Sequence, residues 1–255
     1  MKDIFKLDNK IAVVTGGAGG IGEGLAMGLA VHGATVVVSS RNQESIEAVA
    51  QKITRESGNE AIAIPCDVTD ESSTKNLMDS VVAKYGRIDI LVNAMGLNIK
   101  HDAFEFPMED WDKMFNANVK GTMIACKFAG RVMKDHQGGA IVNLSSVRGI
   151  RGHTGGNTGY CATKGAVELI TRTLALEWAP HNIRVNALGP ALVITPGTKH
   201  IAENPDLAKK YASNVPLGRL GMPEDMVGAV NFLASEAASF VTGQTIYVDG
   251  GLTAA

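Results

Sequence analysis

Residues 11–22 read Ile-Ala-Val-Val-Thr-Gly-Gly-Ala-Gly-Gly-Ile-Gly. The apolar run 11–15 is typical of a buried β-strand, and a helical pattern follows from about Gly20 to His32. Gly16, Gly20 and Gly22 allow the backbone to turn sharply and to approach a ligand closely. A strand, a glycine-rich turn and a helix in this order favour a dinucleotide site, in which the first amides of the helix bind the pyrophosphate. A glycine turn that only packs is the alternative.

Strands and helices alternate along most of the remaining chain. Further strands are expected at 35–38, 61–64, 88–92, 140–144, 183–187 and 244–248, and further helices at about 45–57, 72–85 and 160–179. Nearly continuous apolar strands separated by helices predict a parallel sheet covered on both faces. Right-handed crossovers then give an α/β, Rossmann-type, doubly wound sheet with flanking helices.

One domain is expected over residues 1–255, because no internal repeat, low-complexity tract or linker interrupts the pattern. Residues 195–215 are less regular and contain Pro196, Gly197 and Pro205. They lie between a strand and a segment that opens with Pro223, which is typical of a helix start. So long an insertion predicts a lid over a substrate site.

Composition limits the classes of partner. The formal net charge is −2, with 24 basic and 26 acidic side chains, which argues against a nucleic-acid partner. No apolar stretch approaches the roughly 20 residues of a membrane span, and the N-terminus lacks the apolar core of a signal peptide. Three cysteines, Cys66, Cys126 and Cys161, fit neither a disulfide framework nor a metal motif. We expect reduced thiols, no metal and a cytoplasmic protein.

Ser40 and Arg41 follow the second strand. An acidic residue there would bind the ribose hydroxyls of NAD, whereas a guanidinium matches the oxygens of a 2′-phosphate. Arg41 therefore favours NADP as cofactor, with NAD as the alternative. The alternative is that Arg41 is an exposed loop arginine that binds no phosphate.

Tyr160 and Lys164 are four residues apart in an expected helix, so their side chains share one face. An ammonium beside a phenol lowers the phenol pKa, which suits a general base. A Tyr/Lys pair at this spacing often arises by chance. Here, however, Ser146 lies at the end of an apolar strand, and parallel sheets bind their ligands at the strand ends. Ser146 would donate a hydrogen bond to a substrate carbonyl, and Ser145 is the alternative.

These motifs together resemble the short-chain dehydrogenase/reductase family, over nearly the whole chain. The matching segments are Thr15–Gly22, Asp67-Val68, Asn93–Gly96, Asn118–Gly121, the set Ser146, Tyr160 and Lys164, Asn186–Thr195, and Val241–Gly251. The family implies hydride transfer between a substrate carbon and a nicotinamide without a metal. It also implies a homotetramer.

The resemblance assigns roles to the matching residues. Tyr160 would be the general acid/base, and Lys164 would lower its pKa and hold the nicotinamide ribose. Ser146 would polarise the substrate carbonyl, and Asn118 would hold a water that relays protons. The residues expected to bind the cofactor are Thr15, Gly16, Gly20, Ile21, Gly22, Ser40, Arg41, Asp67, Val68, Asn93, Gly96, Tyr160, Lys164, Pro190, Val193 and Thr195.

The substrate is less determined. The chain resembles the gluconate 5-dehydrogenase-like members of the family, which interconvert gluconate and 5-ketogluconate. Asn98 and His101 follow Gly96, while Arg148 and His153 follow Ser146, and these side chains would bind the carboxylate and hydroxyls of a sugar acid. A solvated loop surface is the alternative.

Other functions stay open at this point. A 3-oxoacyl-(acyl-carrier-protein) reductase or a polyol dehydrogenase would have the same fold and the same motifs. A non-catalytic, dinucleotide-sensing scaffold is the alternative outside enzymes, although all four of Asn118, Ser146, Tyr160 and Lys164 are present.

Overall fold

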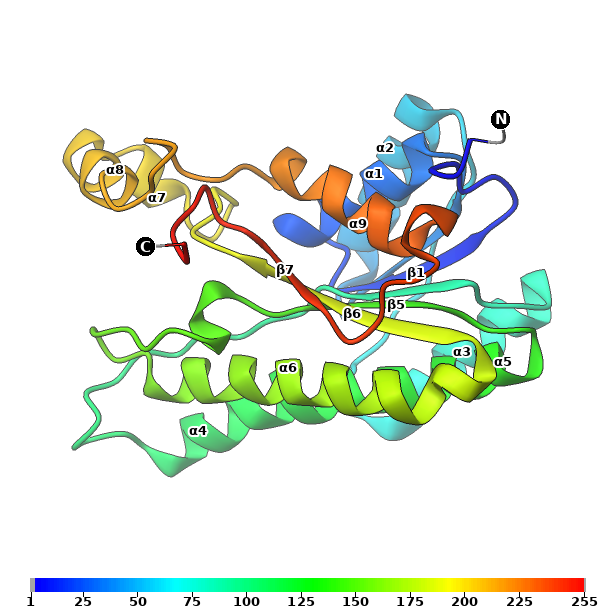
Figure 1. Ribbon diagram of the computed structural model, residues 1–255, viewed down its shortest axis with the longest axis horizontal. Helices are drawn as coiled ribbons and strands as arrows, with labels where there is room; N and C mark the ends of the chain where they lie inside the picture. The colour runs from blue at the N-terminus through cyan, green and yellow to red at the C-terminus, as the bar shows by residue number, and fades with distance from the viewer. Residues whose placement is uncertain (1–2, 255) are drawn as a thin grey trace.

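The computed structural model describes residues 3–254, and a parallel sheet of seven strands forms its centre (Figure 1). The strand order is β3-β2-β1-β4-β5-β6-β7. The doubly wound α/β fold predicted from the sequence is thereby confirmed. The strands are β1 (Ile11–Thr15), β2 (Thr35–Ser39), β3 (Ala61–Ala63), β4 (Ile90–Asn93), β5 (Gly139–Leu144), β6 (Ile183–Pro190) and β7 (Thr245–Val248).

Helices cover both faces of the sheet (Figure 1). One layer holds α1 (Ile21–Val31), α2 (Gln43–Ser57) and α9 (Val227–Ala234). The other holds α3 (Glu71–Tyr85), α5 (Gly121–Asp135) and α6 (Thr158–Trp178). The remaining helices are α4 (Met108–Phe115), a π-helical turn at Asn116–Lys120, α7 (Lys199–Ala202), α8 (Pro205–Ala212) and short 3-10 turns at Val147–Gly149, Ala179–His181, Pro223–Met226 and Glu236–Ala238.

Local sequence explains where the helices begin and end. The side chain of Asn42 accepts a hydrogen bond from Ser45 N at the start of α2, and that of Asp70 caps α3 in the same way. Gly58 and Gly86 then end these helices in the left-handed conformation, which glycine adopts without a steric penalty. Each helix therefore returns the chain to the next parallel strand.

Residues 195–215 contain α7 and α8, which lie at the left of Figure 1, on the side where β5 and β6 end. An isolated bridge pairs Val193 with Gly221 at the base of this segment. Arg219 binds the Asp225 carboxylate with two hydrogen bonds of 2.6 and 2.7 Å just beyond it. The segment is thus anchored at its base, as a lid would require.

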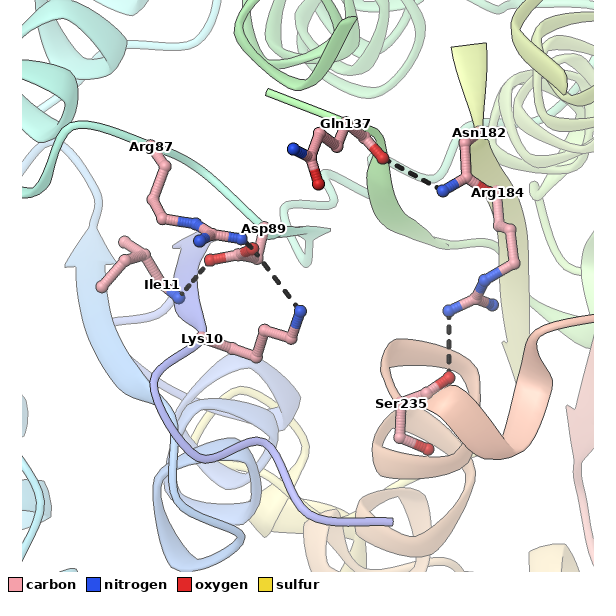
Figure 2. Close-up of polar contacts among 8 residues, drawn as sticks. All are labelled: Lys10, Ile11, Arg87, Asp89, Gln137, Asn182, Arg184 and Ser235. Carbon is pink, nitrogen blue, oxygen red and sulfur yellow. Dashed lines mark hydrogen bonds and ion pairs between the residues drawn. The ribbon is translucent and has the colours of Figure 1, made fainter. Parts of the chain in front are cut away.

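The opposite, amino end of the sheet is held by a buried carboxylate, Asp89 (Figure 2). Ile11 N donates to Asp89 Oδ2 at 2.9 Å, Arg87 pairs with Oδ1, and Lys10 Nζ lies 3.7 Å from it. Asp89 therefore ties the start of β1 to the segment that leads into β4.

Replacing Asp89 by alanine is expected to lower the free energy of unfolding by about 1–3 kcal/mol, the usual cost of leaving a buried donor unpaired. Urea denaturation of the wild type and the variant measures this. An unchanged midpoint would contradict the structural role of the carboxylate. Asp89 lies far from the carboxyl ends of the strands, so we expect this substitution to leave the activity of a site at those ends unchanged.

Candidate active site

Several strands end at one edge of the sheet, where the order reverses between β1 and β4. In doubly wound sheets ligands bind in the crevice at this point. The turn after β1, the segment Asn93–Gly96 after β4, the turn after β5 and the end of β6 all converge on this edge. The geometry therefore brings together most of the segments selected from the sequence.

The glycine turn after β1 is tightly built. Gly16 has a φ of 71°, and a Cβ there would lie 2.7 Å from Met95 N. A Cβ on Gly22 would collide with the carbonyl oxygen of Gly16. Gly20 has a φ of 59°, lies against Thr195 and begins α1 without a side-chain cap. The first amides of α1 are thus free to bind an anion, and the turn fits a pyrophosphate.

Ser40 is half-buried and Arg41 is exposed at the end of β2. Asp67 follows β3, and hydrogen bonds from Thr69, with a weaker contribution from Arg41, lower the pKa of its carboxyl. Val68 packs against Gly121 at the start of α5. Arg41 and Asp67 therefore lie close together beyond the neighbouring strands β2 and β3, and their contact with the adenosine end of a dinucleotide stays a prediction.

Thr15 and Asn93 lie inside the protein. Both are almost completely buried, and Thr15 Oγ1 donates to Asn93 Oδ1 at 3.0 Å. Asn93 Nδ2 donates to Asn143 Oδ1 at 2.9 Å, and Asn143 Nδ2 donates to Thr171 Oγ1 at 3.0 Å. Their side-chain hydrogen bonds are made inside the protein, so their contact with a cofactor stays a prediction. They join β1, β4, β5 and α6 beneath the site.

The turn after β5 distinguishes the two serines. Ser145 Oγ donates to Glu168 Oε1 at 3.0 Å and is buried away from the crevice. Ser146 Oγ accepts from Arg148 N at 3.2 Å and lies 3.4 Å from Pro190 O. Of the two, Ser146 is therefore the serine that faces the end of β6 and the site.

Tyr160 and Lys164 lie one turn apart on α6, which was predicted as a helix. Lys164 is 2% exposed, its Nζ donates to Leu144 O at 2.6 Å, and Nζ lies 5.7 Å from the centre of the Tyr160 ring. A Cβ on Gly96 would lie 3.5 Å from the same Nζ. The ammonium is thus held between the ends of β4 and β5, beside the phenol.

The pKa values of the pair differ from the expectation. Burial raises the pKa of Tyr160, and the Ser146 hydroxyl opposes this shift. Burial also lowers the pKa of Lys164 to about 8. The sequence predicts that Lys164 lowers the pKa of the phenol. In this structure the desolvation of Tyr160 outweighs any such effect, and the Lys164 ammonium points to Leu144 O.

Asn118 lies in the π-helical turn, where its side chain is fully bonded. Its Oδ1 accepts from Leu97 N at 2.7 Å, and its Nδ2 donates to Leu97 O at 2.8 Å and to Thr163 Oγ1 at 3.0 Å. The amide thus fixes the segment after Gly96 against α6. The carbonyl oxygen of Asn118 accepts from Thr122 Oγ1 at 2.7 Å.

The four candidate substrate residues divide into two pairs. Asn98 Nδ2 donates to Asn157 Oδ1 at 3.3 Å, and His101 Nε2 lies 2.7 Å from Asp110 Oδ2, so both have structural partners. Arg148 is half-buried and forms no ion pair within residues 3–254. His153 is largely exposed. Partial desolvation, and then the positive charges of Arg148 and Lys100, lower the pKa of its imidazole.

Arg148 lies near Tyr160 and Cys161. Burial lowers its pKa, and the ionisable side chains around it are Cys161, Arg151, Tyr160 and Tyr211. Of these, Cys161 and Tyr160 belong to α6 and Tyr211 belongs to α8. None of these neighbours is a carboxylate, so no negative charge compensates Arg148 within the described residues.

Comparison with known proteins agrees with this geometry. A family model described as enoyl-(acyl-carrier-protein) reductase matches residues 16–253. A 2-dehydro-3-deoxy-D-gluconate 5-dehydrogenase of Dickeya dadantii is 38% identical over 97% of this chain and 96% of its own length. The chain belongs to the short-chain dehydrogenase/reductase family. The resemblance found in the sequence is thereby confirmed.

Members of this family with different substrates are almost equally similar. A 3-oxoacyl-(acyl-carrier-protein) reductase of Thermotoga maritima is 39% identical over 97% of this chain and 99% of its own length. The solved gluconate 5-dehydrogenase of Burkholderia cenocepacia, in complex with NADP and tartrate, superimposes with a TM-score of 0.93 at 34% identity, covering 99% of this chain and 98% of that one. The family membership therefore fixes the reaction class and leaves the substrate open.

Within residues 3–254, no group of three or more His, Cys, Asp or Glu side chains could hold a metal ion. In that same range, no helix is both long and apolar enough to cross a membrane. The three cysteines are free, and burial raises the pKa of Cys126 to about 12.

Proposed function

We propose that the protein is an NADP(H)-dependent oxidoreductase that interconverts a secondary alcohol and a ketone. The observation that carries this proposal is that Ser146, just beyond β5, lies beside Tyr160 of α6, with the Lys164 ammonium next to the phenol. Two neighbouring hydroxyls suit a carbonyl oxygen, since both can donate to it. When bound, the nicotinamide supplies or accepts the hydride at the substrate carbon.

The chain's own groups handle the proton. In ketone reduction the Tyr160 hydroxyl donates its proton to the carbonyl oxygen, and Ser146 holds that oxygen in place. The Lys164 ammonium stabilises the resulting phenolate. A water on the carbonyl oxygen of Asn118 would return a proton from solvent.

The cofactor residues follow from the same edge of the sheet. The glycine turn, with Gly16, Gly20 and Ile21, would hold the pyrophosphate on the amides of α1. Arg41 would bind the 2′-phosphate, and Val193 and Thr195 would border the nicotinamide. Two solved relatives contain NADP, which supports the choice of this cofactor.

Replacing Arg41 by alanine is expected to raise the KM for NADP by about 10- to 100-fold, because a charge-assisted hydrogen bond contributes about 1.5–3 kcal/mol. The KM for NAD should change little, since NAD lacks the 2′-phosphate. Steady-state kinetics with both cofactors measure the ratio. An equal change in both constants would contradict the assignment.

For the substrate we propose a sugar acid such as gluconate or 5-ketogluconate. The uncompensated guanidinium of Arg148 beside Tyr160 suits a carboxylate, and His153 lies near it. Relatives named for gluconate and 2-dehydro-3-deoxy-gluconate chemistry support this choice. The lid segment, through Tyr211, would close over the bound acid.

The test is a substrate screen that follows NADPH absorbance with sugar acids, uncharged polyols and 3-oxoacyl thioesters. Arg148→Ala should raise the KM for a sugar acid by about 10- to 100-fold. Turnover of an uncharged polyol serves as the control and should be unaffected. An equal rise in KM for the sugar acid and for the polyol would show that Arg148 does not bind the carboxylate.

A 3-oxoacyl reductase is the second candidate, because apolar side chains are exposed near the site. Ile150 follows the Ser146 turn and is 51% exposed, and Leu217 follows the lid and is 70% exposed. These would suit an acyl chain. Rapid turnover of a 3-oxoacyl thioester, with none of any sugar acid, would replace our proposal with this one.

We also propose a cytoplasmic homotetramer. Leu169 and Leu176 on α6 are 56% and 79% exposed, and such apolar side chains on one long helix suit subunit packing. Light scattering after size exclusion measures the assembly.

A further inference from the structure

Glu168 is a buried carboxylate to which the proposed chemistry gives no role. It is 1% exposed and lies on α6, four residues beyond Lys164 and eight beyond Tyr160. The spacing places all three side chains along one face of the helix. A buried charge is costly unless hydrogen bonds satisfy it, so its partners indicate its role.

The Glu168 carboxylate joins three elements. Its Oε1 accepts from Ser145 Oγ at 3.0 Å and from Tyr247 OH at 2.8 Å. Arg172 Nη2 lies 3.6 Å from Oε2. Burial, and then Glu168 itself, raise the pKa of Tyr247, so this hydroxyl stays protonated and keeps donating. The end of β5 and the strand β7 are thereby fixed to α6.

The turn after Ser146 rests on the same group. A Cβ on Gly149 would collide with the Glu168 carboxylate and would lie 2.9 Å from Ser145 Oγ. Glu168 therefore contacts this turn on both sides of Ser146, at Ser145 and at Gly149. Ser146 itself has extended backbone angles, φ −168° and ψ 159°, and successive side chains of an extended chain point in opposite directions.

We propose that Glu168 is a positioning residue that sets the direction of Ser146 toward Tyr160. Holding Ser145 on one side of the backbone directs Ser146 to the other, and contact at Gly149 fixes the end of the turn. Since Glu168 and Tyr160 belong to one helix, the distance between the two reacting hydroxyls is set by a rigid element. This inference rests on the proposed function of Ser146 and Tyr160.

Two substitutions at Glu168 separate positioning from simple burial. Glu168→Gln keeps an oxygen that can accept from Ser145 and Tyr247, whereas Glu168→Ala removes it. Asp89→Ala is the matched control, because it removes another buried carboxylate at the far end of the sheet. Each protein is assayed at a temperature where it is fully folded, with NADPH affinity measured by fluorescence titration.

We expect Glu168→Ala to lower kcat by about 10- to 100-fold, as small displacements of reacting groups do. NADPH affinity should be unchanged, Glu168→Gln should restore kcat to within a few-fold of the wild type, and Asp89→Ala should lower only stability. Equal losses of kcat in Glu168→Ala and Asp89→Ala would overturn the proposal. So would an unchanged kcat in Glu168→Ala. If that variant does not fold, Ser145→Ala takes its place with the same expectations.

A second readout needs no substrate. Because the Ser146 hydroxyl lowers the pKa of Tyr160, a displaced Ser146 should let that pKa rise. Ultraviolet titration of phenolate, with a Tyr160→Phe variant subtracted, should show the rise in Glu168→Ala and not in Asp89→Ala. No difference between these two would refute the positioning role. Absence of turnover in the wild type with every substrate screened would instead count against the proposed function alone.

Discussion

Replacing Tyr160 by phenylalanine is expected to lower kcat by about 10²- to 10⁴-fold, the range that a positioned acid or base contributes. The substitution removes only the hydroxyl, so α6 and its packing should persist. NADPH binding should stay close to that of the wild type, because the glycine turn and Lys164 are untouched. Steady-state kinetics and fluorescence titration with NADPH measure the two effects separately.

A matched control for Tyr160→Phe is Tyr85→Phe. Tyr85 is a half-buried tyrosine at the end of α3, away from the converging strand ends. Losing its hydroxyl should leave kcat unchanged. Retention of more than about a tenth of wild-type kcat in Tyr160→Phe would show that another group transfers the proton.

Much of the fold was predictable because local and global signals agree. Strands such as Val36–Val38 are β-branched and buried on both faces, as a parallel sheet between two helical layers requires. The glycine turn was recognisable because Gly16, Gly20 and Gly22 occupy positions where a side chain would collide or strain the backbone. These constraints act over a few residues and can be read locally.

The direction of individual side chains was less predictable, because it depends on distant partners. Thr15 and Asn93 lie at strand ends and suggest ligand contacts, yet Asn143 and Thr171 hold them inside. His101 suggests a substrate donor, and only the structure shows that its Nε2 lies 2.7 Å from Asp110 Oδ2. Polar residues at the same edge can therefore line a crevice or support it, and sequence position alone does not separate the two.

Glu168 is not among the site residues predicted from the sequence. Its spacing from Tyr160 and Lys164 places it on their helix face, and a carboxylate on the buried face of a helix is unusual. That signal was available from the sequence. Its partner Tyr247 lies 79 residues further along the chain, so only the folded structure could show what the carboxylate holds.

Lys164→Met is the second substitution for which we expect a large effect. It should lower kcat by about two orders of magnitude or more, as the loss of a donor that stabilises a developing charge does. The buried ammonium beside Tyr160 is the group that would stabilise the phenolate, and methionine fills the same space without a charge. Kinetics at saturating cofactor separate this loss from weaker binding of the nicotinamide ribose.

The same substitution should change how stability depends on pH. Burial lowers the pKa of Lys164 to about 8 from an ordinary value of 10.5, so between these two values the unfolded chain binds a proton that the folded chain has released. The free energy of unfolding of the wild type therefore contains a penalty of about 3 kcal/mol below pH 8, which disappears as the pH rises toward 10.5. Lys164→Met lacks this penalty at every pH. Its stability relative to the wild type should fall steadily across this window in urea titrations, and a pH-independent difference would mean that the Lys164 pKa is not lowered.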